Sequence, residues 1–135
     1  MNDISSESLR HFRRDRGLSS ADSNEKIWLV TLGGLIVPLP NFRWRCAILA
    51  QHDAHHILTG YEPTLRGELS LATWELGVRC YANFWANILC GGLLCAGMLI
   101  QPKRTVRAYR KGRSMAHIYQ QLMRGHFEAA SFDQQ

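Results

Sequence analysis

Residues 81–102 form a stretch of 22 residues that contains no charged side chain. Arg79 precedes this stretch, and Lys103 and Arg104 follow it directly. As a helix rising ~1.5 Å per residue, it would be long enough to cross a bilayer core of ~30 Å. Because such a stretch must be shielded from water, the sequence leaves two structures open: a helix inserted into a membrane, or the central helix of a soluble bundle.

The segments on the N-terminal side of this stretch have helical patterns. In residues 42–59, the buried positions recur at alternating four- and three-residue steps, with Asn41 as the predicted N-cap and Gly60 as the predicted stop. Thr64 is the predicted cap of a second helix that runs to about Val78.

Residues 103–124 are expected to form a further helix, and residues 27–39 a buried helix or an interfacial segment. The predicted fold class is therefore all-α: a small helical bundle with one long uncharged helix, either membrane-inserted or lining a lipid cavity. We expect a flexible polar tail over residues 1–26, a single helical metal- and lipid-binding domain over 27–125, and a second tail over 126–135.

The net charge of +5 is concentrated near the C-terminal end. Residues 1–102 carry nine basic and nine acidic side chains, whereas residues 103–135 carry seven basic and two acidic ones. Such a block indicates an anionic surface, and without an accompanying recognition motif it favours phospholipid headgroups over nucleic acid. The four cysteines show no CxxC spacing, which predicts thiols in a reducing compartment.

Histidine and carboxylate side chains cluster at the end of the first predicted helix. His52 and His56 lie one turn apart and differ by about 40° in azimuth, so both can face one ion. Asp53 lies about 60° beyond His56, where it is a third ligand or an outer oxygen. His55 points elsewhere and is expected in the outer shell or at the surface. Glu68 can return on the next helix to close the site.

Two imidazoles with one or two carboxylates form an open ligand set of the catalytic type. We therefore expect a divalent metal bound by His52, Asp53, His56 and Glu68, with zinc in first place and iron, manganese or magnesium as alternatives. Ordinary buried histidines, hydrogen-bonded to the two carboxylates, are the competing interpretation. Glu75 is expected to form a salt bridge with Arg79 at i+4.

The string HDxxH, followed by eleven residues and a glutamate, resembles the signature of the coenzyme Q (ubiquinone) biosynthesis protein four family. The residues that match are His52, Asp53, His56 and Glu68, and the likeness extends over residues 52–77. Residues 109–113 (Tyr-Arg-Lys-Gly-Arg) also look like that family, whereas residues 1–40 do not. Members of the family are markedly longer than this chain.

The resemblance implies an α-helical, membrane-associated metalloprotein that acts on or binds a polyprenylated aromatic quinone precursor, with decarboxylation at C1 as the reaction. It implies Asp53 or Glu68 as a proton shuttle, and Arg110 and Arg113 as partners of a substrate carboxylate or lipid headgroup. The expected partners are a polyprenyl-type lipid, a membrane surface facing a reducing compartment, other quinone-biosynthesis proteins and a second copy of the chain, but not nucleic acid.

Two other functions remain open at this stage. The first is a non-catalytic lipid-binding or scaffold protein, in which the metal is structural or binds a headgroup. The second takes His52–Asp53 as the centre of an HD-type metal phosphohydrolase. That class needs further histidine and aspartate ligands on distant helices, and His117 has no aspartate beside it. The phosphohydrolase is therefore the least favoured of the three functions.

Overall fold

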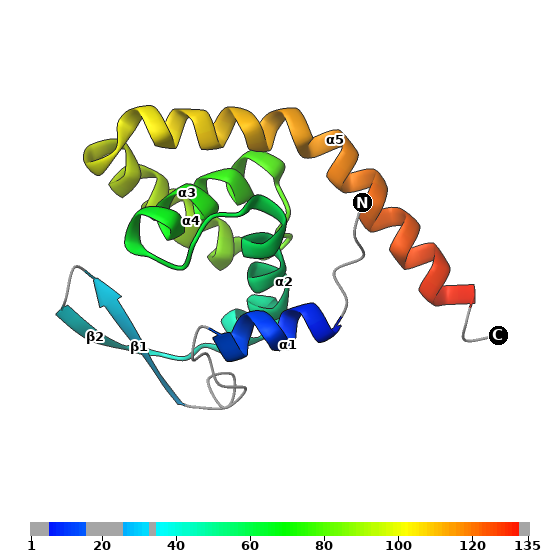
Figure 1. Cartoon of the computed structure of the whole chain (residues 1–135), viewed down its shortest axis with the longest axis horizontal. Coiled ribbons are helices and arrows are strands. Elements are labelled where there is room, and N and C mark those ends of the chain that lie inside the picture. The colour runs from blue at the N-terminus through cyan, green and yellow to red at the C-terminus, as the bar shows by residue number, and fades with distance from the viewer. Residues whose placement is uncertain (1–5, 16–25, 33–34, 133–135) are drawn as a thin grey trace. The chain divides into compact units, whose positions relative to one another are not determined.

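A computed structural model describes residues 6–15, 26–32 and 35–132. Helices dominate this part of the chain, as predicted (Figure 1). They are α1 (Ser6–Asp15), α2 (Arg43–Thr59), α3 (Leu65–Val78), α4 (Phe84–Ile100) and α5 (Pro102–Phe132). The chain divides into two compact units, residues 1–68 (unit 1) and residues 69–135 (unit 2). The single domain expected over residues 27–125 stays a prediction.

Helical structure reaches into both segments that were expected to be tails. Residues 6–15 form α1, which packs against α2 and carries an exposed pair between His11 Nδ1 and Asp15 Oδ2 at 2.9 Å. The pair lies at i,i+4 spacing, where side chains on one helical face meet. At the other end, α5 continues to Phe132. The remaining predicted tail residues, 1–5, 16–25 and 133–135, lie outside the described part of the chain.

The expected helix over residues 27–39 is wrong, because this segment forms an antiparallel β-hairpin. Strand β1 (Ile27–Leu32) pairs with β2 (Leu35–Pro40), with Leu32 opposite Leu35. A helix here would place two adjacent glycines and a proline in its interior, which is unfavourable. A Gly-Gly pair between two runs rich in β-branched and aromatic residues instead favours a hairpin.

The predicted bounds of the next two helices are confirmed almost to the residue. Helix α2 ends at Thr59 and is followed by Gly60, whose φ of 72° is the left-handed conformation that glycine adopts without strain. Thr64 caps α3, since its Oγ1 accepts a hydrogen bond from the Gly67 N–H at 3.2 Å. Asn41 is not the cap of α2: the cap residue is Phe42, which makes no side-chain hydrogen bond there, and Asn41 Oδ1 accepts from Arg45 instead.

Unit 2 is assembled through close backbone approaches at glycines. A Cβ on Gly112 of α5 would lie 2.3 Å from the Trp74 carbonyl oxygen of α3, and one on Gly77 would lie 2.7 Å from the Tyr109 carbonyl oxygen. These two helices therefore cross at a distance that only glycine permits. Gly112 belongs to the Tyr-Arg-Lys-Gly-Arg segment, so the described structure gives this residue a packing role.

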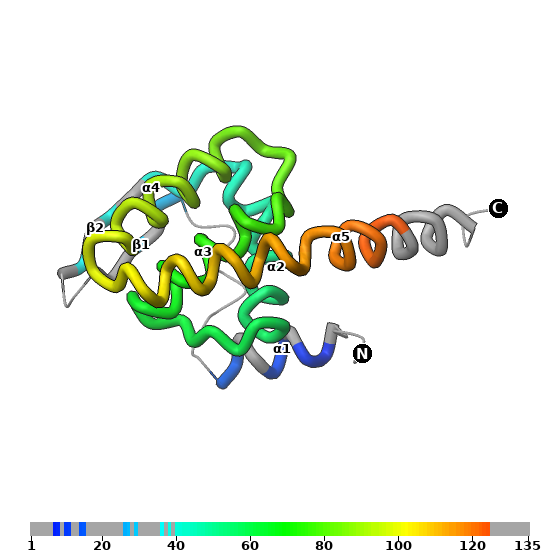
Figure 2. Tube along the Cα trace, turned by 90° about the horizontal axis from the view of Figure 1, so that it is seen from above, coloured from blue at the N-terminus to red at the C-terminus, as the bar shows by residue number. Residues whose placement is uncertain are grey.

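The uncharged segment forms a shorter helix than the 22-residue stretch allows. Helix α4 covers 17 residues and ends at Ile100, because Pro102 disfavours helical backbone in the residue before it, Gln101. Figure 2 shows α4 returning beside the first turns of α5. Within residues 6–15, 26–32 and 35–132, no helix has both the length and the apolar character that crossing a membrane requires.

Glu75 lies in a buried polar cluster of unit 2, so the expected salt bridge with Arg79 is wrong. Its Oε1 accepts a hydrogen bond from the Tyr81 hydroxyl at 2.7 Å, and Cys90 Sγ lies 3.8 Å from its Oε2. Arg79 is exposed and follows α3 with a φ of 60°. Burial is the main cause, and the nearby Glu75 carboxylate the second, of a raised pKa at two groups. The pKa of Cys90 is raised to about 12, and that of Tyr81 above its ordinary range.

Candidate metal centre

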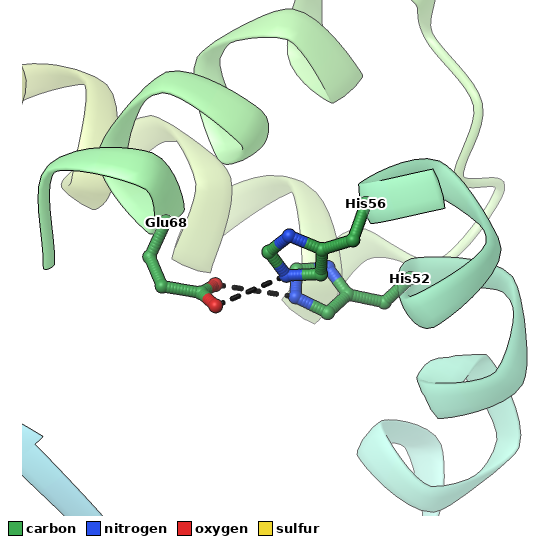
Figure 3. Close-up of side chains that lie close together, drawn as sticks. All are labelled: His52, His56 and Glu68. Carbon is green, nitrogen blue, oxygen red and sulfur yellow. Dashed lines mark hydrogen bonds and ion pairs between the residues drawn. The ribbon is translucent and has the colours of Figure 1, made fainter. Parts of the chain in front are cut away.

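Three of the predicted ligands converge within unit 1. His52 and His56 project from α2, and Glu68 projects toward them from the first turn of α3 (Figure 3). His52 Nε2 lies 3.2 Å from Glu68 Oε2, and His56 Nε2 lies 3.0 Å from Glu68 Oε1. The two imidazole rings stand edge to face, with their centroids 4.9 Å apart. One carboxylate therefore faces two ring nitrogens at once.

The orientation of His56 is fixed by a backbone group. Its Nδ1 lies 2.7 Å from the carbonyl oxygen of Tyr61. Because a carbonyl oxygen can only accept a hydrogen bond, Nδ1 must carry a proton. In the neutral ring Nε2 then presents a lone pair, and that lone pair would face the Glu68 carboxylate at 3.0 Å. This arrangement is repulsive unless a cation, either a second proton or a metal ion, lies between the two atoms.

The loop between α2 and α3 holds Glu68 in place through a tight contact. A Cβ on Gly67 would lie 1.8 Å from the Glu62 carbonyl oxygen, so only glycine permits the loop to pass so close to the first turn of α3. The Glu68 N–H also donates to the Thr64 carbonyl oxygen at 2.8 Å. The backbone that leads into Glu68 is therefore held by two contacts with the preceding loop.

The electrostatics of the centre favour an ionised Glu68. Burial alone would raise the pKa of this carboxyl group. Hydrogen bonds from His52 and His56, together with the positive charge of the two rings, outweigh burial and lower the pKa to about 2. The group is thus a carboxylate at any ordinary pH, which is the form that binds metal ions.

The ligand atoms lie close enough together to hold one small divalent ion. One atom from each of His52, His56 and Glu68 lies within 4.8 Å of the others, so the three side chains can hold a metal ion. A tetrahedral zinc ion with bonds of ~2.0–2.1 Å requires ligand atoms about 3.3 Å apart. The nitrogen–oxygen distances of 3.0 and 3.2 Å, each to one oxygen of Glu68, are close to that value.

The centre is closed on one side and open on the other. The side chain of His56 is 2% exposed, whereas those of His52 and Glu68 are 26% and 35% exposed. A metal ion held by the three would be anchored on its inner side by His56 and would face solvent beside the other two ligands. Three protein ligands with an accessible fourth position are typical of catalytic zinc sites, whereas structural sites are closed by four protein ligands.

Two other residues of the predicted cluster do not join this group of three. Asp53 is buried on α2, about 60° farther around the helix than His56, and it is not among the three residues whose ligand atoms lie within 4.8 Å of one another. His55 is also buried, so the expectation that it lies in an outer shell or at the surface is wrong as to the surface. The structure thus brings together three of the four predicted ligands, and Asp53 as the fourth stays a prediction.

Arg110 and Arg113 lie on α5, in unit 2, and both are exposed. Their predicted role toward a carboxylate or headgroup stays a prediction. Two features that shape the centre could not be identified as functional from sequence. The Tyr61 group is a backbone carbonyl, which any residue provides, and the need for glycine at position 67 depends on a contact with the preceding loop.

Comparisons of the chain with protein-family models, with curated proteins and with solved structures find no match. The resemblance to the ubiquinone-biosynthesis family therefore rests on the spaced motif of His52, Asp53, His56 and Glu68 and on the neighbouring residues that look alike.

Proposed function

We propose that this protein binds a divalent metal ion through His52, His56 and Glu68 and uses it on an aromatic lipid substrate. The single observation that carries the metal site is the contact between His56 and Glu68. The Tyr61 carbonyl fixes the proton of His56 on Nδ1, so that Nε2 faces a carboxylate at 3.0 Å and needs a cation between them. A hydrogen bond from the far ring nitrogen is also typical of metal-ligating histidines.

Zinc is the proposed ion. Two imidazole nitrogens and one carboxylate match its preference for mixed nitrogen and oxygen ligands, and iron or manganese accept the same set. Magnesium ranks lower, because it prefers oxygen ligands and keeps several waters. The three ligands lie on two helices joined by five residues, 60–64, so the site is held by local chain geometry.

The proposed substrate is a polyprenylated hydroxybenzoate, and the proposed reaction is loss of the carboxyl group at C1. The support for this choice is the resemblance of the HDxxH-x11-E motif to the ubiquinone-biosynthesis family. A bound divalent ion would supply positive charge beside the carboxylate or phenolate of such a ring. Of the two proposed proton carriers, Glu68 is held ionised by the histidines, which leaves Asp53 to deliver a proton to the ring carbon.

The test is a turnover assay on the zinc-loaded protein with a short-chain prenylated 4-hydroxybenzoate labelled at the carboxyl carbon. We expect release of labelled CO2 that stops when a chelator is added and that is absent in His56→Ala. The assay is run with and without oxygen, because the oxidative form of the reaction needs an external oxidant. Asp53→Asn should retain zinc and lose turnover if Asp53 delivers the proton.

Metal content measured on the same samples distinguishes failure of the proposed reaction from failure of the proposed metal site. Stoichiometric zinc without turnover under either condition would reject the decarboxylase and leave the non-catalytic lipid-binding role. Protein that is folded and binds no metal would reject the site itself. In that case His52, His56 and Glu68 would form only a hydrogen-bonded cluster.

A further inference from the structure

Helix α4 exposes its large apolar side chains and buries its small ones. Leu99 is 88% exposed, Phe84 is 68% exposed and Trp85 is 58% exposed. We call the exposed set the α4 apolar face; it comprises Phe84, Trp85, Ile88, Leu89, Met98, Leu99 and Ile100. The buried residues of the same helix are Ala86, Cys90 and Gly97. This is the reverse of the usual arrangement, in which the larger apolar residues fill the core.

The two sets occupy separate sides of the helix. At 100° per residue, the α4 apolar face covers an arc of about 200°, and Leu99 lies near its centre. The three small residues lie within about 40° of one another on the opposite side. Gly97 there meets α5, where an added Cβ would lie 2.6 Å from Thr105 Oγ1. The small residues thus let α4 pack closely on α5 and turn the large residues outward.

An outward apolar arc along a whole helix marks an interaction surface. Single exposed apolar residues are ordinary, but a contiguous apolar patch rimmed by polar residues is typical of a binding site for a protein or a membrane. The arc contains no charged side chain from residue 84 to residue 100. Gly91 and Gly92 have open space around them, so nothing within unit 2 fills the middle of the helix.

The charge of unit 2 identifies the kind of partner. Residues 1–68 carry eight basic and eight acidic side chains, whereas residues 69–135 carry eight basic and three acidic ones. Exposed Lys103, Arg104 and Arg107 follow directly after the α4 apolar face, and exposed Arg79 precedes it. Two copies of unit 2 would bring like charges together, whereas an anionic bilayer attracts them and accepts the apolar side chains.

We infer that the α4 apolar face is a docking surface for an anionic phospholipid bilayer, with α4 lying in the plane of the headgroup–acyl boundary. The 17 residues of α4 extend over ~25 Å, and the basic residues beyond its end are placed for phosphate groups. Trp85, at the first turn, has the amphipathic ring that is enriched at this boundary. This surface lies wholly in unit 2, and its test does not depend on the metal centre.

The first experiment is co-sedimentation of the full chain with vesicles of phosphatidylcholine, alone or mixed with phosphatidylglycerol. We expect binding to the mixed vesicles, weakened by salt. Leu99→Asp should lower the partition coefficient at least about tenfold, since it removes a fully inserted side chain and adds a negative charge. The matched control is Ile118→Asp on α5, which makes the same change at another exposed apolar position and should bind like wild type.

Two double variants, each of which removes two positive charges, test whether basic residues beside the α4 apolar face contribute to binding. Lys103→Gln with Arg107→Gln removes two positive charges beside the α4 apolar face and should weaken binding roughly tenfold or more. Arg10→Gln with Arg14→Gln removes two exposed charges from α1 and should change binding much less. Equal effects of the two pairs would show that only total charge matters and would overturn the docking surface.

Two further measurements distinguish a bilayer on the α4 apolar face from a second copy of the chain or another part of the same chain. A polar maleimide should label the exposed Cys95, which lies within this arc, more slowly when mixed vesicles are present. Sedimentation velocity on wild type and Leu99→Asp reports self-association. A dimer that Leu99→Asp dissociates, with vesicle binding unchanged, would make the face a contact between copies. A large fall in the melting temperature of Leu99→Asp would place the face inside the folded chain, and either result overturns the inference.

Discussion

The metal centre and α4 depart from ordinary burial in opposite directions. In unit 1, the polar ring of His56 is buried and faces a carboxylate. In unit 2, α4 turns Leu99 and its apolar neighbours toward solvent. Each arrangement calls for something specific beside it: the first needs a positive charge, a proton or a metal ion, between the His56 nitrogen and the carboxylate, and the second needs an apolar partner. The chemistry of each departure therefore indicates the chemistry of what binds there.

The difference also shows which parts of the molecule are fixed by their own contacts. The three ligands are held by a backbone carbonyl, a helix cap and a contact that only glycine permits. The α4 apolar face has no comparable contacts and gains its stability from the buried side of the same helix. Changes at the centre should consequently affect ligand binding strongly, whereas most changes on α4 should leave the fold intact.

The largest effect is expected from removing a ligand. His56→Ala should lower zinc affinity by more than ~100-fold, because loss of an outer-shell partner alone typically costs 10–100-fold. Competition with a chromophoric zinc chelator measures the change. His117→Ala, which removes an exposed histidine of α5, is the matched control and should bind zinc like wild type. Zinc affinity in His56→Ala equal to that of the control would contradict the assigned centre.

Cysteine reactivity sharpens the contrast between the two sides of α4. Cys95 is exposed, whereas Cys90 is buried and its pKa is raised to about 12 by burial and the Glu75 carboxylate. Since the thiolate is the reactive form, Cys95 should be alkylated at least about tenfold faster at mildly alkaline pH. Mass spectrometry of time points measures both rates, and urea should remove the difference. Equal rates in the folded protein would mean that α4 is not oriented as described.

Gly67 offers a test of how the centre is held. Gly67→Ala places a methyl group against the Glu62 carbonyl, which should cost about 1–3 kcal/mol of stability and shift Glu68 enough to weaken zinc binding about tenfold. Gly91→Ala is the comparison, because its Cβ meets nothing within 4 Å. That change should stabilise α4 by up to ~1 kcal/mol and leave zinc affinity unchanged. Urea unfolding and zinc titration of both variants check this. Similar results for the two glycines would remove the proposed role of the loop.

The smallest effect concerns acid stability of the metal-free protein. The pKa of Glu68 is lowered from 4.5 to about 2 in the folded chain, so its contribution is fully present above about pH 4.5 and is lost as the pH falls toward 2. A partly exposed pair of this kind contributes roughly 1 kcal/mol or less. The difference in unfolding free energy between wild type and Glu68→Gln should therefore shrink over this range. A difference that stays constant from pH 5 to pH 2.5 would contradict the ion pairing.

Helical bounds and ligand spacing were predictable where local rules decide the structure. Gly60 favours the end of a helix and Thr64 favours the start of one by their own conformational and hydrogen-bonding preferences. The i,i+4 spacing of His52 and His56 places both rings on one face. Helical geometry also places Asp53 near that face, about 60° beyond His56, but the structure brings together only His52, His56 and Glu68. The place of Asp53 in the ligand set stays a prediction.

Other features depend on contacts that local rules do not contain. The long apolar run over residues 27–39 favours a helix or interfacial segment, whereas the structure follows the Gly33–Gly34 turn signal and pairs the two halves as strands. The i,i+4 rule pairs Glu75 with Arg79, whereas its partner in the structure, Tyr81, lies beyond the end of α3, where helical spacing says nothing. The direction in which α4 faces was also hidden, because an almost uniformly apolar helix has no polar side to mark the surface.

X-ray absorption fine structure of the zinc-loaded protein tests the central claim most directly. The account predicts a first shell of nitrogen and oxygen only, at ~2.0–2.1 Å, with outer scattering from two imidazole rings. Glu68→Ala should change this first shell or lose the ion. A sulfur ligand at ~2.3 Å, or zinc that washes out of the folded wild-type protein, would contradict a metal centre built from His52, His56 and Glu68.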